Sequence, residues 1–496
     1  MNKPWSRRLY AGTALSLAGV LAVSACGNSA SSEQAAADSV SVGSIVSTSA
    51  INPLMSYYGT WLLAAYEPLV TVDPATGEGQ PSLAESWELA EDELTWTFKL
   101  REGVTFHDGS EFTAEDVVFS LTTIQEKGYQ PATYLTQVES VTAVGDYEVQ
   151  IVTSEPTPLL LSQLSLAYIA PSDAWTEEGF NSTGAGTGPY EITGFDAGQS
   201  ITLTANDDYW GEAPATPNVT LRTFSDQTSL QSAFEAGEVD IAHQLGPNAI
   251  QVLGSNYNVS TEWGGSLNFF QFNADKGAFA NPELRRAANL AVDAEALTAS
   301  MTAGAGEIED GQLALEGVAG YSPDITRPEF DPEEAKKIVE AEGATGTEIT
   351  ITGQSSQNKN LYEAMGQMLE AAGFKVKLNL VEIADWVVQA RGTTDADILY
   401  RGLSFNGIYD IDRGFTTISR MNSSEEWAAL YDATRNEMDK ETREELLIEA
   451  SEYVNEQNLA LWTFAAPAVG AVQEGVKGVD FSTGLSLQLT DITKTS

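Results

Sequence analysis

The stretch from Leu94 to Leu121 constrains the fold more than any other part of this sequence. Apolar and polar residues alternate from Leu94 to Leu100, which is the pattern of a strand with one buried face. Two turn signals, Glu-Gly and Asp-Gly, bracket a second short strand that we expect at 104–106. Thr113 is then expected to cap a helix whose first turn is acidic and whose apolar residues recur at helical spacing. The stretch predicts a β-hairpin that leads into a helix.

The same stretch contains residue types that could suggest catalysis. His107 and Asp108 lie close to Arg101 and to several carboxylates. Polar residues at turns need no partner other than water, so their presence is expected on structural grounds alone. We therefore interpret them as turn residues and not as a catalytic group.

Residues 100–120, LREGVTFHDGSEFTAEDVVFS, resemble the Leu-Arg-x-Gly-Val-x-Phe-His-Asp-Gly…Phe-Thr-Ala-x-Asp-Val pattern of the family 5 extracellular solute-binding proteins. That family comprises the dipeptide, oligopeptide and nickel receptors of ABC importers. Other segments resemble the family as well: 66–70, 81–87, 186–190 (GTGPY), 206–211, 282–293 and Leu461-Trp462. The resemblance covers most of the chain, and it implies that the block around His107 is structural.

Composition limits the partners that this chain can have. Its 496 residues exceed the usual size of a single hydrophobic core, so several lobes are expected. The net charge of −46 disfavours nucleic acid and anionic membrane surfaces as partners. The same charge suits either a hydrated acidic surface or the steering of cationic solutes. With two histidines in the chain, we expect no histidine-rich metal site and no cofactor.

The N-terminus has the pattern of an exported lipoprotein. A basic segment ending at Arg8 precedes the apolar stretch 9–20, which is too short to span a bilayer. Val23-Ser24-Ala25-Cys26 follows, and it resembles the bacterial lipobox, with the single cysteine of the chain at the site of lipid attachment. We therefore expect a signal peptide at 1–25, lipid on Cys26, a flexible tether at 26–38 and an extracytoplasmic, membrane-anchored protein. An ordinary cleaved signal with an incidental cysteine is the alternative.

The clearest α/β pattern lies in the last third of the chain. Ile349 and Ile351 mark a strand, and apolar residues from 361 to 372 then recur with one helical face. Alternation returns from Phe374 to Leu380, so the order is strand, helix, strand. This order predicts two parallel strands joined by a right-handed crossover.

The family resemblance implies an α/β, two-lobed periplasmic-binding-protein-like fold with mixed sheets, a hinge and an extra subdomain. By analogy, lobe I comprises 39–71, 188–272 and 466–496, the extra subdomain 72–187, and lobe II 273–465. The solute is then expected between lobes I and II.

Motifs that an enzyme would need are missing from the sequence. His107 and His243 are too far apart for a His-Glu-x-x-His zinc motif. Residues 402–406 fail the nucleophile elbow because Asn406 stands where a glycine is required. Carboxylates are so numerous that close pairs arise by chance, which leaves a secreted hydrolase of the glycosidase type as the alternative function. We expect a binding protein without catalytic residues.

The expected binding residues follow from the family's pockets. They are Trp263, Phe270, Trp386, Arg401, Ser404, Phe405, Asn406 and Asp410. Peptide-binding members carry a Trp-x-x-Asp-Tyr loop whose Asp holds the peptide's α-amine, and Asn406 occupies that position here. Asp410 could take over the amine, and Arg401 could hold a carboxylate. The expected partners are a peptide or similar small solute and an ABC importer permease, with the chain itself a monomer.

Overall fold

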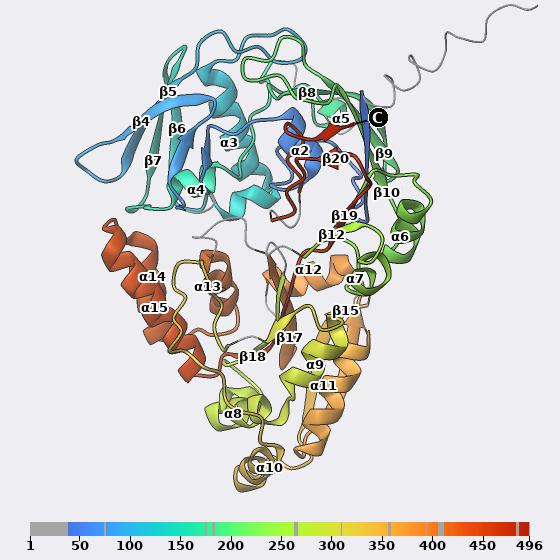
Figure 1. Cartoon of the computed structure of the whole chain (residues 1–496). Helices are drawn as coiled ribbons and strands as arrows, with labels where there is room; N and C mark the ends of the chain where they lie inside the picture. The colour runs from blue at the N-terminus through green and yellow to red at the C-terminus, as the bar shows by residue number, and fades with distance from the viewer. Residues whose placement is uncertain are drawn as a thin grey trace, which may run out of the picture.

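The computed structural model describes residues 38–73, 76–173, 176–180, 184–261, 266–308, 310–355, 359–392, 394–404, 411–482 and 486–495. The expected signal peptide, Cys26 and nearly all of the tether lie outside these residues. The chain forms an upper part, made of lobe I and the extra subdomain, and a lower part, lobe II (Figure 1). Within the described residues, no helix has both the length and the apolar character needed to cross a bilayer.

Lobe I is a seven-stranded sheet in the order β12-β19-β11-β1-β10-β9-β8. The central strand β1 runs parallel to both of its neighbours, and the outer strands are antiparallel. Its elements are β1 (Ser39–Ser44), α2 (Thr60–Ala65), β8 (Tyr190–Asp196), β9 (Ser200–Ala205), β10 (Asn218–Thr223), α6 (Gln227–Glu235), β11 (Ile241–His243), α7 (Asn248–Leu253), β12 (Asn258–Ser260), β19 (Gly470–Val472), β20 (Val476–Lys477) and β21 (Thr493–Lys494).

The extra subdomain is built on an antiparallel sheet in the order β4-β5-β7-β6. Helix α3 lies against this sheet, next to β6 and β7. The elements are β2 (Val70–Val72), β3 (Gly79–Pro81), β4 (Ala84–Leu89), β5 (Thr95–Leu100), α3 (Ala114–Lys127), η1 (Gln130–Thr133), β6 (Val138–Gly145), β7 (Glu148–Thr153), α4 (Leu160–Leu164) and α5 (Glu177–Phe180).

The organising stretch folds largely as its pattern predicts. Strand β5 buries Trp96, Phe98 and Leu100 on one face, and α3 begins after Thr113 with a complete capping box to Asp116. The predicted strand at 104–106 is wrong, because this segment forms only an isolated bridge between Thr105 and Glu111. The reason lies in the sheet: β5 already pairs on both sides, with β4 and β7, and cannot accept a further partner.

Lobe II is a six-stranded mixed sheet in the order β14-β18-β13-β17-β15-β16. The predicted pair of parallel strands with a helix between them is confirmed, since β15 and β16 are parallel and α11 connects them. The elements are β13 (Ser266–Phe272), η2 (Ala278–Ala280), α8 (Pro282–Ala291), α9 (Ala294–Met301), β14 (Glu307–Ile308), α10 (Pro332–Ala341), β15 (Glu348–Gln354), α11 (Lys359–Ala371), β16 (Lys375–Val381), α12 (Ile383–Arg391), β17 (Ile398–Ser404), α13 (Ile411–Ser419), α14 (Glu425–Asn436), α15 (Lys440–Glu456) and β18 (Ala460–Ala466).

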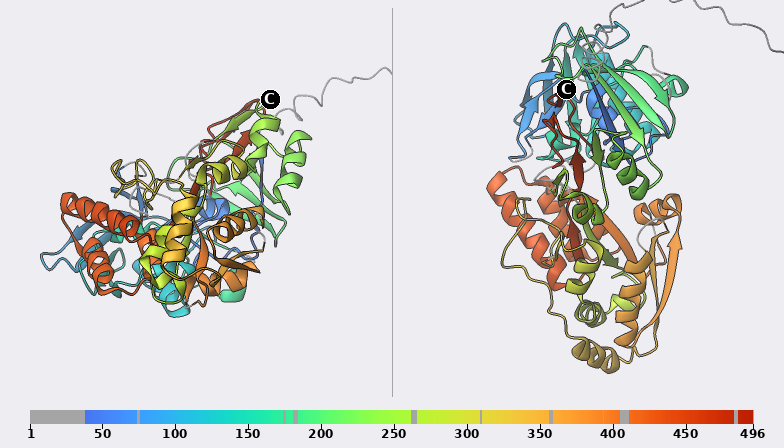
Figure 2. Two further views of the ribbon diagram at one scale, coloured as in Figure 1. Left: turned by 90° about the horizontal axis from the view of Figure 1, so that it is seen from below. Right: turned by 45° about the vertical axis from the view of Figure 1, so that its right-hand side comes forward.

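The chain passes between the two halves twice. It leaves lobe I after β12 and enters lobe II at β13, and it returns between β18 and β19 (Figures 1 and 2). Because β13 pairs with β17 and β18, residues 266–272 lie in the sheet of lobe II, whereas the sequence expectation assigned them to lobe I. The predicted class, an α/β fold of mixed sheets, is confirmed.

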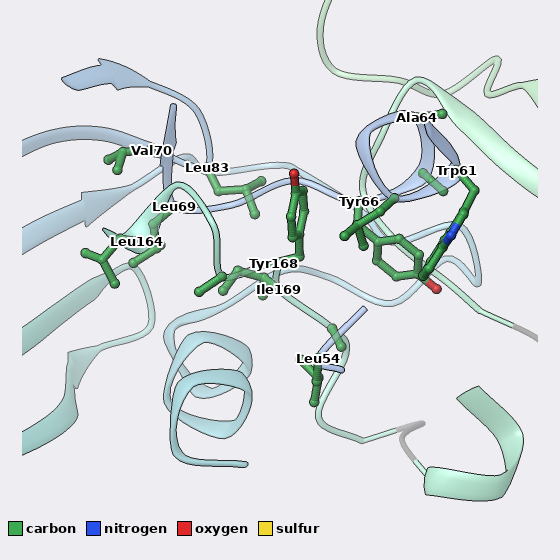
Figure 3. Close-up of a cluster of buried hydrophobic side chains, with 14 of the residues drawn as sticks. Leu54, Trp61, Ala64, Tyr66, Leu69, Val70, Leu83, Leu164, Tyr168 and Ile169 are labelled. Carbon is green, nitrogen blue, oxygen red and sulfur yellow. The ribbon is translucent and has the colours of Figure 1, made fainter. Parts of the chain in front are cut away.

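An apolar cluster joins lobe I to the extra subdomain. Figure 3 shows side chains from three separate segments, 54–70, Leu83 and 164–169, gathered in one interior. Tyr66 and Tyr168 are among the largest of them, and both are almost fully buried. Continuous packing of this kind gives the two units a shared interior, and interiors at crystal-like density resist sliding of one unit past the other.

The family-like motifs converge on one buried carboxylate beside this cluster. Glu67 accepts hydrogen bonds from Thr187 Oγ1 and Trp210 Nε1, both at 2.8 Å, and from the Tyr209 hydroxyl at 2.9 Å. Arg101 lies over the Trp210 ring, with Cζ 4.1 Å from its centroid. Burial raises the pKa of Glu67, and the three donors and the guanidinium oppose that change.

His107 has a structural role in the same region. Its Nδ1 accepts from the Gly186 N–H at 3.1 Å, and its Nε2 lies 3.0 Å from the Gly188 carbonyl oxygen, so these bonds fix the neutral ring with its proton on Nε2. The glycine-rich segment 184–189 is thereby held as it passes from the extra subdomain to β8. The structural interpretation of His107 is confirmed.

Candidate functional site

Side chains from all three units meet at one place between the halves, which we call the junction. Tyr57 comes from the loop between β1 and α2, Tyr134 follows η1, and Arg413 lies in the first turn of α13. The Tyr57 and Tyr134 rings are 5.3 Å apart and nearly perpendicular, at 89°. Arg413 Cζ lies 5.6 Å from the centre of the Tyr57 ring, within range of a cation–π contact between lobe II and lobe I.

The junction contains a small cavity. Its volume is about 20 Å³, which is room for a single water molecule. It is lined by Tyr134, Leu159, Ser162, Gln163, Leu166, Asp412 and Arg413. The lining supplies a guanidinium, one aromatic ring, a carboxyl group, an amide, a hydroxyl and two leucines. With the Tyr57 ring beside Tyr134, these groups can together hold a small molecule that has an anionic group and an apolar part. The cavity is too small to hold a solute in this arrangement of the halves.

Two adjacent residues of opposite charge, Asp412 and Arg413, line the cavity of the junction. Burial raises the pKa of Asp412, and the guanidinium of Arg435 and a hydrogen bond from Tyr431 act against this change. The Tyr431 hydroxyl lies 3.2 Å from Asp412 Oδ1 and 2.6 Å from Thr416 Oγ1. Asp412 is thus bound within lobe II, while the neighbouring Arg413 extends toward lobe I.

Aromatic packing fixes the position of α13. Phe415 lies edge-on to Trp427, with ring centres 5.5 Å apart, and Trp427 stacks on Tyr431 at 5.8 Å and on Tyr453 at 5.7 Å. Helices α13, α14 and α15 are therefore one packed unit. Arg413 is presented to the junction from a rigid element and not from a loop.

Two of the aromatic residues expected in the site lie together in the interior of lobe II. Phe270 on β13 is fully buried against Tyr362 and Tyr400. Trp386 on α12 is half-buried, and its Nε1 donates to the Tyr400 carbonyl oxygen at 3.3 Å. In this arrangement Phe270 has no face open to a solute, and a role in binding stays a prediction for both residues.

Arg401 is also enclosed in lobe II. Its Nε donates to Gln271 Oε1 at 2.8 Å and its Nη1 to the Ala390 carbonyl oxygen at 2.9 Å. Burial, together with the nearby Arg420, lowers the pKa of Arg401 to about 9. Its side chain lies on the opposite face of β17 from Tyr400, the cross-strand partner of Phe270, so the structure does not bring Arg401 together with Phe270. Trp386 packs against the cluster that contains Ala390 and Met421, which are also hydrogen-bond partners of Arg401.

The remaining expected site residues cannot be placed. Trp263, Phe405, Asn406 and Asp410 lie outside the described residues, and Ser404 is described only as the last residue of β17. Within the described chain, no three histidine, cysteine or acidic side chains are grouped closely enough to hold a metal ion.

Sequence reasoning missed the residues that form the junction. Tyr57 and Tyr134 lie in segments without periodicity, and nothing local distinguishes them from core tyrosines. Arg413 was the easiest of the three to detect. A positive charge in the first turn of a helix interacts unfavourably with the helix dipole, so an arginine at that position needs another explanation. Such a residue is a reasonable candidate for a functional role.

Comparison with known proteins identifies the fold and the family. The profile described as "Bacterial extracellular solute-binding proteins, family 5 Middle" matches residues 78–421. A Brucella ovis protein, named as a candidate ABC transporter peptide-binding protein, is 28% identical over 376 residues, 71% of each chain. Heme-binding protein A of Haemophilus influenzae is 27% identical over 459 residues, 82% of each chain.

A solved structure has the same fold. The periplasmic binding protein DppA of Helicobacter pylori, in complex with the peptide STSA, superposes with a TM-score of 0.82 at 23% identity. The superposition covers 92% of this chain and 98% of the other.

Proposed function

This chain belongs to the family 5 bacterial extracellular solute-binding proteins, and we propose that it captures a peptide or peptide-like solute at the junction of its lobes. Members of this family are substrate-binding proteins of ABC transporters and not enzymes, so the bound solute leaves the protein chemically unchanged. Capture precedes delivery to the importer's permease.

The observation that carries the proposal is the meeting of Tyr57, Tyr134 and Arg413 from three separate units of the fold. A site composed in this way is complete only when the halves approach each other. Solute binding would therefore favour the approach of lobe II to lobe I, because a ligand stabilises the state in which it makes more contacts.

The chemistry of the junction suits a peptide. Arg413 can pair with a carboxylate through two parallel hydrogen bonds, and the tyrosine rings can cover apolar side chains or peptide planes. Relatives point the same way, since one is named as a candidate peptide-binding protein and a structural neighbour holds the peptide STSA. Another relative is named heme-binding protein A, and heme, like a peptide, bears carboxylates. We therefore expect an anionic group in the solute more generally than we expect a peptide.

The test compares peptides with a free and an amidated C-terminus by calorimetric titration. An ion-paired hydrogen bond contributes about 1.5–3 kcal/mol, so amidation should weaken binding roughly 10- to 150-fold. Arg413→Ala should weaken the free peptide by a similar factor and leave the amide unchanged. Arg286→Ala, which removes an exposed arginine on α8, is the matched control. Equal affinity of both peptides for the wild-type protein would refute the role of Arg413.

We also propose that Cys26 carries lipid and holds the protein at the membrane. The support is its place as the only cysteine, directly after Val23-Ser24-Ala25. Several acyl chains on one residue anchor a protein durably, where a single chain would do so only marginally. The segment 26–38 would then act as the tether that positions the lobes near the permease.

A further inference from the structure

A second contact between the halves involves residues other than those of the junction. Gln137 of the extra subdomain donates from Nε2 to Glu155 Oε1 at 3.0 Å and to Asn436 Oδ1 at 3.2 Å. Asn436, the last residue of α14, donates from Nδ2 to Glu155 Oε2 at 3.0 Å. These three side chains form a closed triangle of hydrogen bonds between the extra subdomain and lobe II. The Glu155 carboxylate accepts two of the three bonds. We call this group of three side chains the triad.

The lobe II side of the triad is held rigidly. Arg443 of α15 donates from Nη1 to the Glu437 carbonyl oxygen at 2.9 Å and to that of Met438 at 3.4 Å, which fixes the turn between α14 and α15. The Met438 side chain packs against the core of the upper half, and Leu159 packs in the reverse direction against the core of α13–α15. The turn faces the extra subdomain in Figure 1. Gln137 is buried and Glu155 and Asn436 are partly buried, so water reaches the triad only in part.

Helix α14 connects the triad to the junction. Five residues before Asn436, Tyr431 bonds to Asp412 and Thr416 of α13, the helix that carries Arg413. A rigid helix with one end at the triad and its middle at the junction cannot move at one place without moving at the other.

We propose that Gln137, Glu155 and Asn436 form a latch that favours contact between the halves and thereby determines solute affinity without touching the solute. Opening breaks the two hydrogen bonds that Asn436 makes with Gln137 and Glu155 and returns these groups to water, while the bond between Gln137 and Glu155 lies within the extra subdomain. A hydrogen bond to a charged group favours the latched arrangement about tenfold or more. The apparent affinity of a solute is its intrinsic affinity multiplied by the fraction of protein able to hold it, so a latch that acts on the arrangement of the halves changes the binding of every solute by one common factor.

The design of the triad allows a compensating exchange. Asn436→Asp places a second carboxylate against Glu155 and removes the amide donor, so the latch should open. Adding Glu155→Gln restores it in mirrored form, because the new amide at 155 can donate to the new carboxylate at 436 while Gln137 still donates to both. The double variant has the net charge of the wild type. Asp432→Asn, at an exposed position of α14, is the control.

The opening can be measured without a solute, so the result does not depend on the proposed function. Replacing the only cysteine, Cys26, by serine allows spin labels at Val144→Cys in the extra subdomain and Val388→Cys in lobe II, positions that are 58% and 70% exposed. Pulsed dipolar spectroscopy then gives the distance distribution between the halves. We expect one main distance for the wild type and the control, and loss of most of that population in Asn436→Asp.

The double variant should recover the wild-type distribution. If circular dichroism shows that Asn436→Asp does not fold, Asn436→Ala takes its place. We then expect a smaller loss of the population at the main distance. A wild-type distribution in the single variants would overturn the latch, and so would a double variant as open as Asn436→Asp.

Discussion

Replacing Glu67 tests whether the family-like motifs owe their arrangement to one buried carboxylate. Glu67→Ala removes the acceptor of three hydrogen bonds and leaves the Trp210 N–H, the Tyr209 hydroxyl and the Thr187 hydroxyl without it. Each bond to a charged group contributes about 1.5–3 kcal/mol, and contributions of neighbouring groups are not additive. Because removal of the charge also ends its burial cost, we expect a net local destabilisation of about 3–5 kcal/mol.

Glu67→Gln separates hydrogen bonding from charge. The amide oxygen can still accept from Trp210 and Thr187, and the amide nitrogen can donate to the Tyr209 hydroxyl, which is able to accept. Only the charge assistance is lost, at about 1 kcal/mol for each retained bond, and relief of the buried charge offsets part of that loss. We therefore expect a local destabilisation of about 1–2 kcal/mol for Glu67→Gln.

Hydrogen exchange measured by mass spectrometry over 184–211 gives the local free energy without assuming that a protein of several lobes unfolds in one step. A loss of 3–5 kcal/mol should speed exchange in this segment roughly 150- to 5,000-fold, and Glu67→Gln should speed it about 5- to 30-fold. Exchange in α10 and α11 of lobe II should stay unchanged. Wild-type exchange in Glu67→Ala would refute the reasoning, as would equal effects of the two variants.

Three further predictions concern the same scaffold and the anchor. Burial lowers the pKa of His107 from its ordinary value of 6.5, so the unfolded chain binds the proton more readily and stability should fall as pH drops below about 6.5. Chemical denaturation of His107→Gln should lack this part of the pH dependence of stability. An unaltered pH dependence in this variant would exclude the role of His107. In Gly186→Ala the new Cβ would clash with the Ala65 carbonyl oxygen, so a thermal melt should show a loss of stability of about 1–3 kcal/mol. Gly145→Ala, with nothing within 4 Å of the new Cβ, should be close to neutral, and equal melting of both variants would contradict this. Cys26→Ser should release the protein from the membrane fraction, and full retention would disprove lipid anchoring there.

The parts of the fold that follow from local chemistry were predictable. Thr113 begins α3 because its side chain and Asp116 satisfy the free backbone N–H groups, and α11 lies between β15 and β16 because its apolar residues repeat on one face. The error at 104–106 arose from pairing, since whether a short strand finds a partner depends on which edges other segments have already occupied.

The site was less predictable for a related reason. Arg401 looked like a ligand for a carboxylate, yet Gln271 and the Ala390 carbonyl oxygen, far away in sequence, enclose it. Tyr57 and Tyr134 gain their significance only from the packing that brings lobe I and the extra subdomain together. Local pattern determines what a helix buries, but not which loops meet across a junction.

Native mass spectrometry tests the central claim, that the chain holds one intact solute at the junction, most directly. The protein would be incubated with a defined mixture of di- to tetrapeptides and heme. We predict a single adduct per chain with the mass of one unmodified component, retained in Arg286→Ala and strongly reduced in Arg413→Ala. Cleavage products in the mixture, or an adduct that persists undiminished in Arg413→Ala, would contradict the account.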